Sequence, residues 1–368
     1  MAVLTYQCPH CGGELVFDPK DGRFACPFCL SRFTEDEVKA LDPARQSEQA
    51  AQPSGEAEAA SSAREQPAGE DAADEFAAHA VVYHCPTCGA EIVTDDTTAA
   101  TRCHYCHNPV VLEGRLSGAD KPDALIPFRY DREQAVHSFL DWVGKRKFVP
   151  RDFFSKKQIE NLTGVYLPYW VTDAGGEVSL RGVGRRVRIW RTGDIEYTET
   201  RNYRVERAGS IEFKEYTSIA LQKADRELTT RILPYDFSEL IDFSMPYLSG
   251  YQADRYDIAR ETVAPGVENQ LRAYSEQLLR GRVDGYASVS VENVQADLSR
   301  QSWRCALLPV WLLTYRDKRK DKLYYFAMNG QTGEIVGELP LSRGRLAALF
   351  AAVFVPVFLL TLLGGWLL

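Results

Sequence analysis

The stretch CPHCGGELVFDPKDGRFACPFC, residues 8–29, contains two Cys-x-x-Cys pairs, and CPTCGAEIVTDDTTAATRCHYC, residues 85–106, contains two more. In both stretches fourteen residues separate the inner cysteines. The likeness continues beyond the cysteines, because CGGELV at residues 11–16 aligns with CGAEIV at residues 88–93. The sequence therefore contains an internal repeat of one small motif.

The cysteine spacing within each repeat predicts a metal site. Two residues between cysteines allow one tight turn to direct both sulfurs at a common ion, and Gly12 and Gly89 supply the permissive backbone that such a turn needs. The run between the pairs is typical of strand, turn and strand, so each repeat is predicted to be a zinc ribbon. We expect two structural Zn²⁺ ions per chain, each closed by four thiolates and therefore unable to activate water. The predicted ligands are Cys8, Cys11, Cys26, Cys29, Cys85, Cys88, Cys103 and Cys106.

Two other uses of the eight cysteines stay open. Disulfides would suit a secreted chain, but no positively charged, apolar, cleavable leader precedes Cys8. Iron would suit the Cys-Pro-x-Cys-Gly pairs, which resemble those of rubredoxins, although the run between the pairs is short for that family. His84, His104 and His107 flank the second repeat, and we expect them to be surface or supporting residues because eight thiols complete two sites.

The segment between the two repeats is acidic. Between Asp42 and Glu75, nine Asp or Glu residues oppose two Arg residues, so this stretch carries seven of the eight net negative charges of the chain. Its few large apolar residues cannot bury enough surface to fold, and we expect a flexible linker that separates the ribbons by roughly a few tens of Å. The predicted organisation is ribbon 1 at 1–41, a disordered linker at 42–79, ribbon 2 at 80–115, an α+β domain at 116–342 and a transmembrane anchor at 343–368.

The C-terminal run LAALFAAVFVPVFLLTLLGGWLL, residues 346–368, carries no charge. Its 23 residues would form roughly 34 Å of helix, enough to cross a hydrocarbon layer of roughly 30 Å. Arg343 and Arg345 precede the run, and the positive-inside rule favours the cytoplasm for them, where thiols stay reduced. We expect a single-pass protein of the bacterial cytoplasmic (inner) membrane, with its N-terminal domains in the cytoplasm and residues 346–368 in the lipid bilayer.

The middle of the chain predicts an α+β domain with a mostly antiparallel sheet and helices. DREQAVHSFLDWVGKRK begins with a capping box of Asp131 and Gln134 and predicts a helix. SKKQIENLTG predicts a second helix that ends at Gly164. Alternating residues on either side of RTGD, residues 191–194, predict a β-hairpin. GVENQLRAYSEQLLRG predicts a further helix that ends at Gly281.

The sequence contains none of the catalytic motifs that we searched for. It has no Gly-x-x-x-x-Gly-Lys-Ser/Thr loop, no Gly-x-Ser-x-Gly elbow and no His-Glu-x-x-His. Cys305 is flanked by apolar residues, which favours a buried thiol over a nucleophile. We therefore expect a protein that is not an enzyme, while an enzyme with its site in the sheet domain would need a concave pocket with converging polar groups.

Several motifs together resemble one bacterial family. They are the Cys-Pro-x-Cys ribbons, ALIPFRYDREQAV, YLPYW, LSGYQADRYD and MNGQTGEIVGELP, followed by the membrane span. The family consists of membrane-anchored zinc-ribbon proteins often labelled primosomal protein N′ or helicase-like, a label that the missing motor motifs do not support. Some relatives occur beside phage-shock-type and SPFH-type membrane proteins. The resemblance therefore implies a role in recruiting such partners to the membrane during envelope stress.

Two functions are compatible with these observations. The first is a membrane-anchored adaptor in which zinc shapes two recognition surfaces that recruit membrane-associated proteins. The alternative is nucleic-acid binding, because zinc ribbons commonly serve it and RGVGRRVRIWR forms a basic hairpin around Trp190. The arginines of that hairpin would equally suit anionic lipid headgroups or a solvated strand face. They are Arg181, Arg185, Arg186, Arg188 and Arg191.

Overall fold

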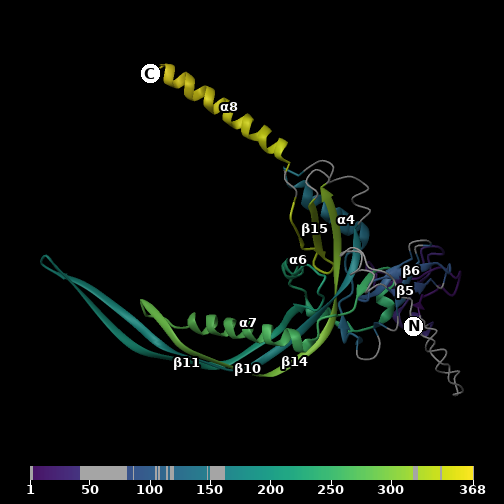
Figure 1. The fold of residues 1–368 in the computed structure, drawn as a ribbon, viewed down its shortest axis with the longest axis horizontal. Helices are drawn as coiled ribbons and strands as arrows, with labels where there is room; N and C mark the ends of the chain where they lie inside the picture. The colour runs from purple at the N-terminus through teal and green to yellow at the C-terminus, as the bar shows by residue number, and fades with distance from the viewer. Residues whose placement is uncertain are drawn as a thin grey trace, which may run out of the picture. The chain divides into compact units, whose positions relative to one another are not determined.

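A computed structural model describes most of the chain (Figure 1). The described residues are 3–41, 81–85, 87–103, 106, 108–112, 115–116, 120–146, 148–149, 162–317, 322–339 and 342–367. The predicted linker, His104, His107 and nearly all of the helix predicted before Gly164 lie outside them. Gly164 itself lies in a strand, not at the end of a helix.

The described residues form an α+β protein with mostly antiparallel sheets, as the sequence predicts. They divide into two compact units that do not follow the predicted domain boundaries. Unit 1 comprises Met1–Leu167, Lys223–Arg255 and Leu307–Leu368, whereas unit 2 comprises Pro168–Gln222 and Tyr256–Ala306. Both ribbons belong to unit 1, and the expected α+β domain is shared between the units.

Each ribbon is built from short strands. Ribbon 1 contains β2 (Val16–Asp18), β3 (Arg23–Ala25) and β4 (Arg32–Phe33) in one small antiparallel sheet, followed by α1 (Glu35–Ala40). Ribbon 2 contains β5 (Val81–His84) paired with β6 (Glu91–Thr94), and β7 (Thr98–Arg102) paired with β8 (Pro109–Leu112).

The two ribbons are joined by the pairing of two β-strands. Strand β1 (Val3–Leu4), which leads into ribbon 1, pairs antiparallel with β8 of ribbon 2 in the register Val3 to Leu112 and Leu4 to Val111. The expectation that the linker holds the ribbons apart is therefore wrong for the described residues. The composition of the linker gives no information about this pairing, because the two strands are more than a hundred residues apart in the sequence.

Ribbon 1 also packs on the rest of unit 1. The N–H of Phe17 donates to the carbonyl of Ser249 at 3.2 Å, and the Ser249 hydroxyl donates to the carbonyl of Leu15. Phe17 and Phe24 pack with Tyr247 at ring-centroid distances of 4.8 and 5.5 Å. Buried residues of ribbon 1 consequently belong to the same hydrophobic core as the main sheet.

The remainder of unit 1 surrounds an aromatic core. Phe128 stacks on Tyr251 at 4.2 Å and meets Trp311 edge-on at 5.2 Å. The predicted helix forms as α4 (Arg132–Gly144), with the expected capping box at Asp131 and Gln134. The other elements are β9 (Ala124–Leu125), α6 (Arg226–Arg231), η4 (Phe237–Glu239), β12 (Ile241–Asp242), η5 (Met245–Leu248), β13 (Gln252–Asp254), β15 (Lys322–Asn329) and β16 (Ile335–Gly337).

Two long strands contribute to both units. They are β10 (Thr163–Thr192) and β14 (Ser288–Asp317), and they belong to one sheet with the strand order β1-β8-β7-β13-β10-β14-β15-β16. Within unit 1, β13 pairs in parallel with β10 and antiparallel with β7.

Unit 2 consists of a long hairpin, one further strand and one helix. The predicted turn at residues 191–194 connects β10 with β11 (Ile195–Ile219) in a hairpin whose register runs from Tyr169–Ile219 to Thr192–Ile195. Helix α7 (Arg260–Arg280) lies along the sheet of β10, β11 and β14 (Figure 1) and buries Val267 and Leu271 against it. Close approach of β14 requires Gly176, because a Cβ atom there would lie 1.6 Å from the carbonyl oxygen of Asp297.

The C-terminal helix α8 (Arg343–Leu367) is apolar and exposed. Residues Gly344–Thr361 are long and apolar enough to cross a membrane, and none of them is buried within the molecule. The Arg345 guanidinium donates to the carbonyl of Val149 at 2.8 Å, which fixes the start of the helix to unit 1.

Candidate metal centres

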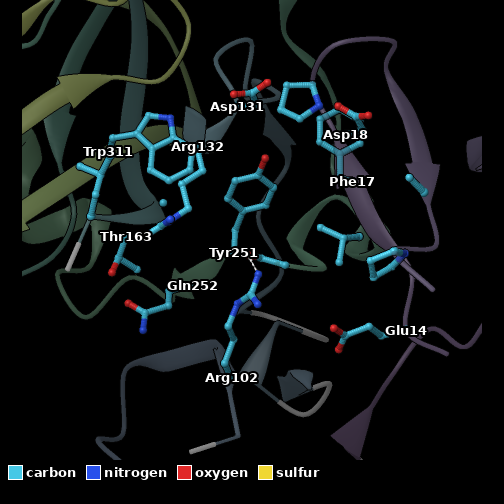
Figure 2. Close-up of a pocket in the computed structure, with 17 residues that line it drawn as sticks. Glu14, Phe17, Asp18, Arg102, Asp131, Arg132, Thr163, Tyr251, Gln252 and Trp311 are labelled. Atoms are coloured by element: carbon cyan, nitrogen blue, oxygen red, sulfur yellow. Dashed lines mark hydrogen bonds between the residues drawn. The ribbon is translucent and has the colours of Figure 1, made fainter. Parts of the chain in front are cut away.

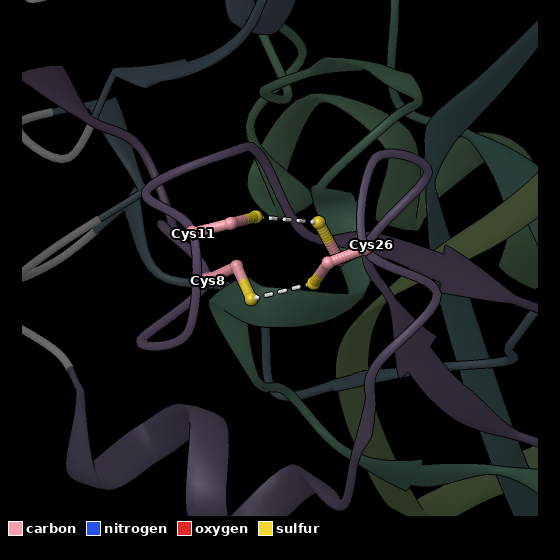
Figure 3. A group of neighbouring side chains, drawn as sticks. Cys8, Cys11 and Cys26 are labelled. Carbon is pink, nitrogen blue, oxygen red and sulfur yellow. Dashed lines mark hydrogen bonds between the residues drawn. The ribbon is translucent and has the colours of Figure 1, made fainter.

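The structure brings the eight predicted ligands together in two clusters of four. In ribbon 1 the Sγ atoms of Cys8 and Cys29 lie 3.5 Å apart, as do those of Cys11 and Cys26, and the side chains face one another across a small gap (Figure 3). In ribbon 2 the corresponding distances are 3.6 Å for Cys85–Cys106 and 3.7 Å for Cys88–Cys103. All four sulfurs of a cluster lie within 4.8 Å of one another.

These distances fit a metal ion and not a disulfide. Sulfurs at about 2.3 Å from a central Zn²⁺ in a tetrahedron lie about 3.8 Å from one another, close to the observed 3.5–3.7 Å. A disulfide would bring two sulfurs to about 2.05 Å. Four thiolates in a tetrahedron suit zinc or iron, so both clusters are able to hold a metal ion.

The first turn of each ribbon has the same backbone geometry. The N–H of Cys8 donates to the carbonyl of Gly13 and the N–H of Gly12 to that of Cys8; in ribbon 2, Cys85 bonds in the same way to Ala90, and Gly89 to Cys85. Gly12 and Gly89 have the same φ of 73°, the left-handed region that favours glycine. The repeat in the sequence is therefore a repeat in structure.

Each cluster has a buried side and a solvent side. Cys8 and Cys26 are buried in ribbon 1, whereas Cys11 and Cys29 are exposed. Hydrogen bonds from the hydroxyl and backbone N–H of Ser31 lower the pKa of Cys29 to about 6. A backbone hydrogen bond from Gly13 would lower the pKa of Cys11, the other exposed thiol, but hydrogen bonds with the neighbouring thiols raise it to about 12. Metal binding requires the deprotonated form, so an ion that binds at neutral pH would release protons from the cluster.

The second turn of ribbon 1 differs from the first and presents two apolar side chains. Leu30 occupies the place that Gly12 has in the first turn and adopts a φ of 60°, a conformation that costs a non-glycine residue about 1 kcal/mol. Its side chain is 78 % exposed, and that of Phe28 is 70 % exposed. We call Phe28 and Leu30 the apolar knuckle. Nothing in the cysteine spacing signals it, and the sequence analysis missed it.

A cleft of about 760 Å³ lies between ribbon 1 and the main sheet of unit 1 (Figure 2). Tyr251 lies in the middle of the lining, with Arg102 on one side of it and Asp131 on the other. The Arg102 guanidinium donates to the carbonyl of Gly250 at 2.8 Å. The Asp131 carboxylate forms an ion pair with the Lys20 ammonium at 2.7 Å. The ion pair of Lys20 with Asp131 thus connects ribbon 1 to the start of α4.

Ribbon 2 is fixed by a partly buried charge cluster. The Lys223 ammonium lies 2.7 Å from Asp95 of ribbon 2 and 2.8 Å from Asp254 of β13. Burial would raise the pKa of Asp95, but hydrogen bonds from Lys223 and Thr98 outweigh it and hold that pKa well below its usual range. Burial raises the pKa of Asp254 despite Lys223. The positive charge of Lys223 therefore offsets the repulsion between the neighbouring carboxyl groups of Asp95 and Asp254.

The other described residues that the sequence singled out are not members of the two thiol clusters. His84 is exposed and lies 3.7 Å from Glu91, and Cys305 is buried, as expected. The arginines of the predicted basic hairpin lie on β10 in unit 2, whereas the clusters lie in unit 1.

Comparison with known proteins gives one relative of similar length. A protein from Bacillus subtilis (strain 168), described as uncharacterized protein YdjG, is 32 % identical to the chain over 357 residues, which cover 97 % of this chain and 96 % of the relative. No family model matches the chain, and no solved structure matches it.

Proposed function

The chain belongs to the family of Bacillus subtilis YdjG, and we propose that it is a non-enzymatic, membrane-anchored zinc-binding adaptor. In this proposal it recruits partner proteins at the cytoplasmic face of the bacterial inner membrane during envelope stress. The resemblance described above favours membrane-associated partners of the SPFH or phage-shock type.

The exposed apolar knuckle carries the proposal. Glycine would adopt the φ of residue 30 without strain, and the first turn of each ribbon has glycine at the corresponding position, Gly12 and Gly89. The chain instead has an exposed leucine in a strained conformation beside an exposed phenylalanine. Strain and exposed apolar surface at one point are typical of a protein contact site.

Zinc in this proposal shapes the knuckle and takes no part in chemistry. Four thiolates fill the tetrahedron, which leaves no position for a water molecule. The soft thiolate set suits zinc in a reducing compartment. The Phe17–Tyr247 packing gives the zinc-shaped turn a rigid support.

The membrane anchor in this proposal is α8. Its exposed side chains are almost all apolar, and a bilayer would cover them. Arg343 and Arg345 at its start favour a cytoplasmic position for the residues before the helix. An anchored adaptor meets membrane-associated partners at a raised effective concentration.

The test is quantitative mass spectrometry of the full-length protein, purified from bacterial membranes in mild detergent after nuclease treatment, with metal measured in the same sample. We expect two zinc ions per chain and a stoichiometric protein partner that the double variant Phe28→Ser, Leu30→Ser loses. The matched control is Val82→Ser, Val93→Ser, which removes two exposed apolar residues of ribbon 2 and is expected to keep the partner.

Two outcomes would contradict this proposal, the first for the adaptor itself and the second for the binding role of the apolar knuckle. Loss of every partner on nuclease treatment would favour the nucleic-acid alternative. Equal partner recovery from the knuckle variant and from the wild type would show that the apolar knuckle does not bind it.

A further inference from the structure

The end of the β10–β11 hairpin extends beyond the point where the backbone of a third segment pairs with it. The N–H of Ala287, just before β14, donates to the carbonyl of Arg185 at 2.8 Å. Beyond that point the two strands pair only with each other in the described part of the chain, from Arg186–Arg201 to Thr192–Ile195. We call residues 186–201 the hairpin tip. A two-stranded ribbon has no core of its own and is marginally stable in water.

The hairpin tip carries apolar side chains on both faces. Successive residues of a strand point to opposite faces, so Ile189 lies on one face, and Trp190 with its cross-strand partner Tyr197 on the other. The Trp190 and Tyr197 rings stack at 5.5 Å with an interplanar angle of 12°. Ile189 and Ile195 are 61 % and 59 % exposed. Exposed apolar residues therefore lie on both faces of the hairpin next to its turn, where Arg191, Asp194 and Glu196 are exposed as well.

Further arginines lie beside these apolar residues, on the side away from the turn. Arg185, Arg186 and Arg188 form no ion pair with any described carboxylate, in contrast to Arg191, which lies 3.8 Å from Glu196. The Arg188 guanidinium lies over Trp190 at 5.6 Å, and that of Arg186 over Tyr203 at 5.3 Å. Arg186 also donates to the carbonyl of Gly285 at 2.9 Å and lies over Tyr286 at 5.2 Å. The charges of Arg185 and Arg188 thus lie one to four residues from the exposed side chain of Ile189.

We propose that the hairpin tip inserts into the headgroup region of an anionic lipid bilayer, as a membrane contact additional to α8. Ile189, Ile195 and Trp190 would enter the boundary between headgroups and acyl chains, where tryptophan and tyrosine are favoured. The arginines behind them would bind lipid phosphates. An anchored chain would keep such a tip close to lipid, so that a weak contact suffices.

Lipid fits the tip better than single-stranded nucleic acid does. Proteins that bind single strands present open aromatic faces on which bases stack, whereas the Trp190 ring is stacked on Tyr197 and overlain by Arg188. The two isoleucines would gain nothing from a sugar-phosphate chain. A bilayer, in contrast, would bury apolar side chains on every side of an inserted tip.

The experiment uses the full-length protein reconstituted into vesicles of phosphatidylcholine with phosphatidylglycerol, in the presence of a single-stranded oligonucleotide. The photo-crosslinking amino acid benzoylphenylalanine is placed at Ile195, or as a control at Ser210, an exposed residue of β11 outside the tip. We expect lipid adducts at position 195 and none at position 210. Replacing Arg185, Arg186 and Arg188 by Gln should lower the adduct yield at least about tenfold. The matched variant, with Arg260, Arg272 and Arg280 of α7 replaced by Gln, should not.

An adduct of position 195 with the oligonucleotide or with protein, instead of lipid, overturns the proposal. The absence of any adduct at position 195 also overturns it. Equal lipid-adduct yields in the two arginine variants also overturn it, because insertion would then not involve the charges of the tip. Resistance of each sample to alkaline extraction reports the insertion of α8 separately, so failure of the tip contact is distinguishable from failure of the membrane anchor.

Discussion

The ring of Phe17 in ribbon 1 lies 4.8 Å from the ring of Tyr247 in η5, centroid to centroid. This contact joins ribbon 1, with its candidate metal site, to a segment about 230 residues further along the chain. The four thiols and the packed rings are different residues, so the candidate metal site and the packing of ribbon 1 can be tested separately.

Phe17→Ala should undock ribbon 1 without removing its metal. Loss of a buried phenylalanine costs about 3 kcal/mol or more, and the four thiolates do not involve this side chain. Hydrogen exchange of residues 14–25 in the full-length protein should become faster, while the metal content stays at two ions per chain. Phe28→Ala is the matched control, because Phe28 is exposed. Unchanged exchange in the Phe17 variant would show that the ring does not hold the ribbon.

Cys8→Ser should remove one metal ion of two. A serine hydroxyl is a poor replacement for a thiolate, and the ribbon fold depends on the metal. Elemental analysis should give about one ion per chain, with faster hydrogen exchange confined to ribbon 1. Cys305→Ser changes a buried thiol outside both clusters and should keep both ions. Two ions in the Cys8 variant would contradict the predicted ligand set.

Lys223→Met should destabilise unit 1 by about 2 kcal/mol at pH 7, because it leaves Asp95 and Asp254 together without their cation. Solvent screens the partly exposed lysine, so the loss is smaller than for a fully buried ion pair. The folded-state pKa of Asp254 is already raised, and losing Lys223 would raise it further. A carboxyl group with a raised folded pKa favours folding below its unfolded pKa, and this contribution is lost as the pH rises through the folded value. The variant should therefore regain stability, relative to the wild type, as the pH falls from 7 towards the unfolded pKa of aspartate, about 3.9.

Thermal unfolding of the full-length protein at several pH values would measure this effect. Lys223→Met with Asp254→Asn should recover most of the loss at pH 7. The control is Lys322→Met, whose exposed pair with Glu338 at 2.9 Å should contribute less than about 1 kcal/mol. Parallel pH profiles for Lys223→Met and the wild type would contradict the assigned role of the lysine.

Leu30→Gly should stabilise metal-bound ribbon 1 by about 0.5–1 kcal/mol, because glycine adopts a φ of 60° without strain. Gly12→Ala, at a φ of 73°, should have the opposite effect by a similar amount. Hydrogen exchange of ribbon 1, measured at increasing temperature, would compare the thermal stability of the two variants. A destabilised Leu30→Gly variant would mean that the leucine packs in the isolated protein and would weaken the case for a contact site.

Gly176→Ala should disrupt the sheet of unit 2. Its Cβ atom would meet the carbonyl oxygen of Asp297 at 1.6 Å, so the backbone would have to move, at a cost of about 2 kcal/mol or more. Gly209→Ala on β11 has open space around its new Cβ atom and should change stability by less than about 0.5 kcal/mol. Similar melting temperatures for the two variants would contradict the close approach of β14.

The sequence predicted the features that depend on neighbouring residues. The cysteine spacing with Gly12 and Gly89 indicated both ribbons, and the capping box at Asp131 and Gln134 marked the start of α4. The turn at residues 191–194 marked the hairpin. Each of these depends on backbone conformations within a few residues of one another, which propensity and spacing describe well.

Long-range pairing could not be predicted in the same way. The pairing of Val3 with Leu112 depends on the register between distant strands, for which the sequence holds no local signal. Residues 163–192 form a single strand although glycines at 175, 176, 182 and 184 interrupt the alternation. These glycines are places of close contact with neighbours in three dimensions rather than strand ends. The apolar knuckle was missed because exposure is a property of the folded molecule.

The hydrogen bond from Ser249 to Leu15 spans 234 positions of the chain and therefore sets an order of events during synthesis. A ribosome that adds about 5–20 residues per second needs on the order of 10–50 s between the two residues. Ribbon 1 can bind its metal as soon as it emerges, because its ligands are close in sequence, but its docking surface does not yet exist. During that interval the newly made ribbon is complete as a metal site while the apolar surface around Phe17 is still uncovered. If the cluster took up no metal, ribbon 1 would pass the same interval without an ion to hold its four thiolates together.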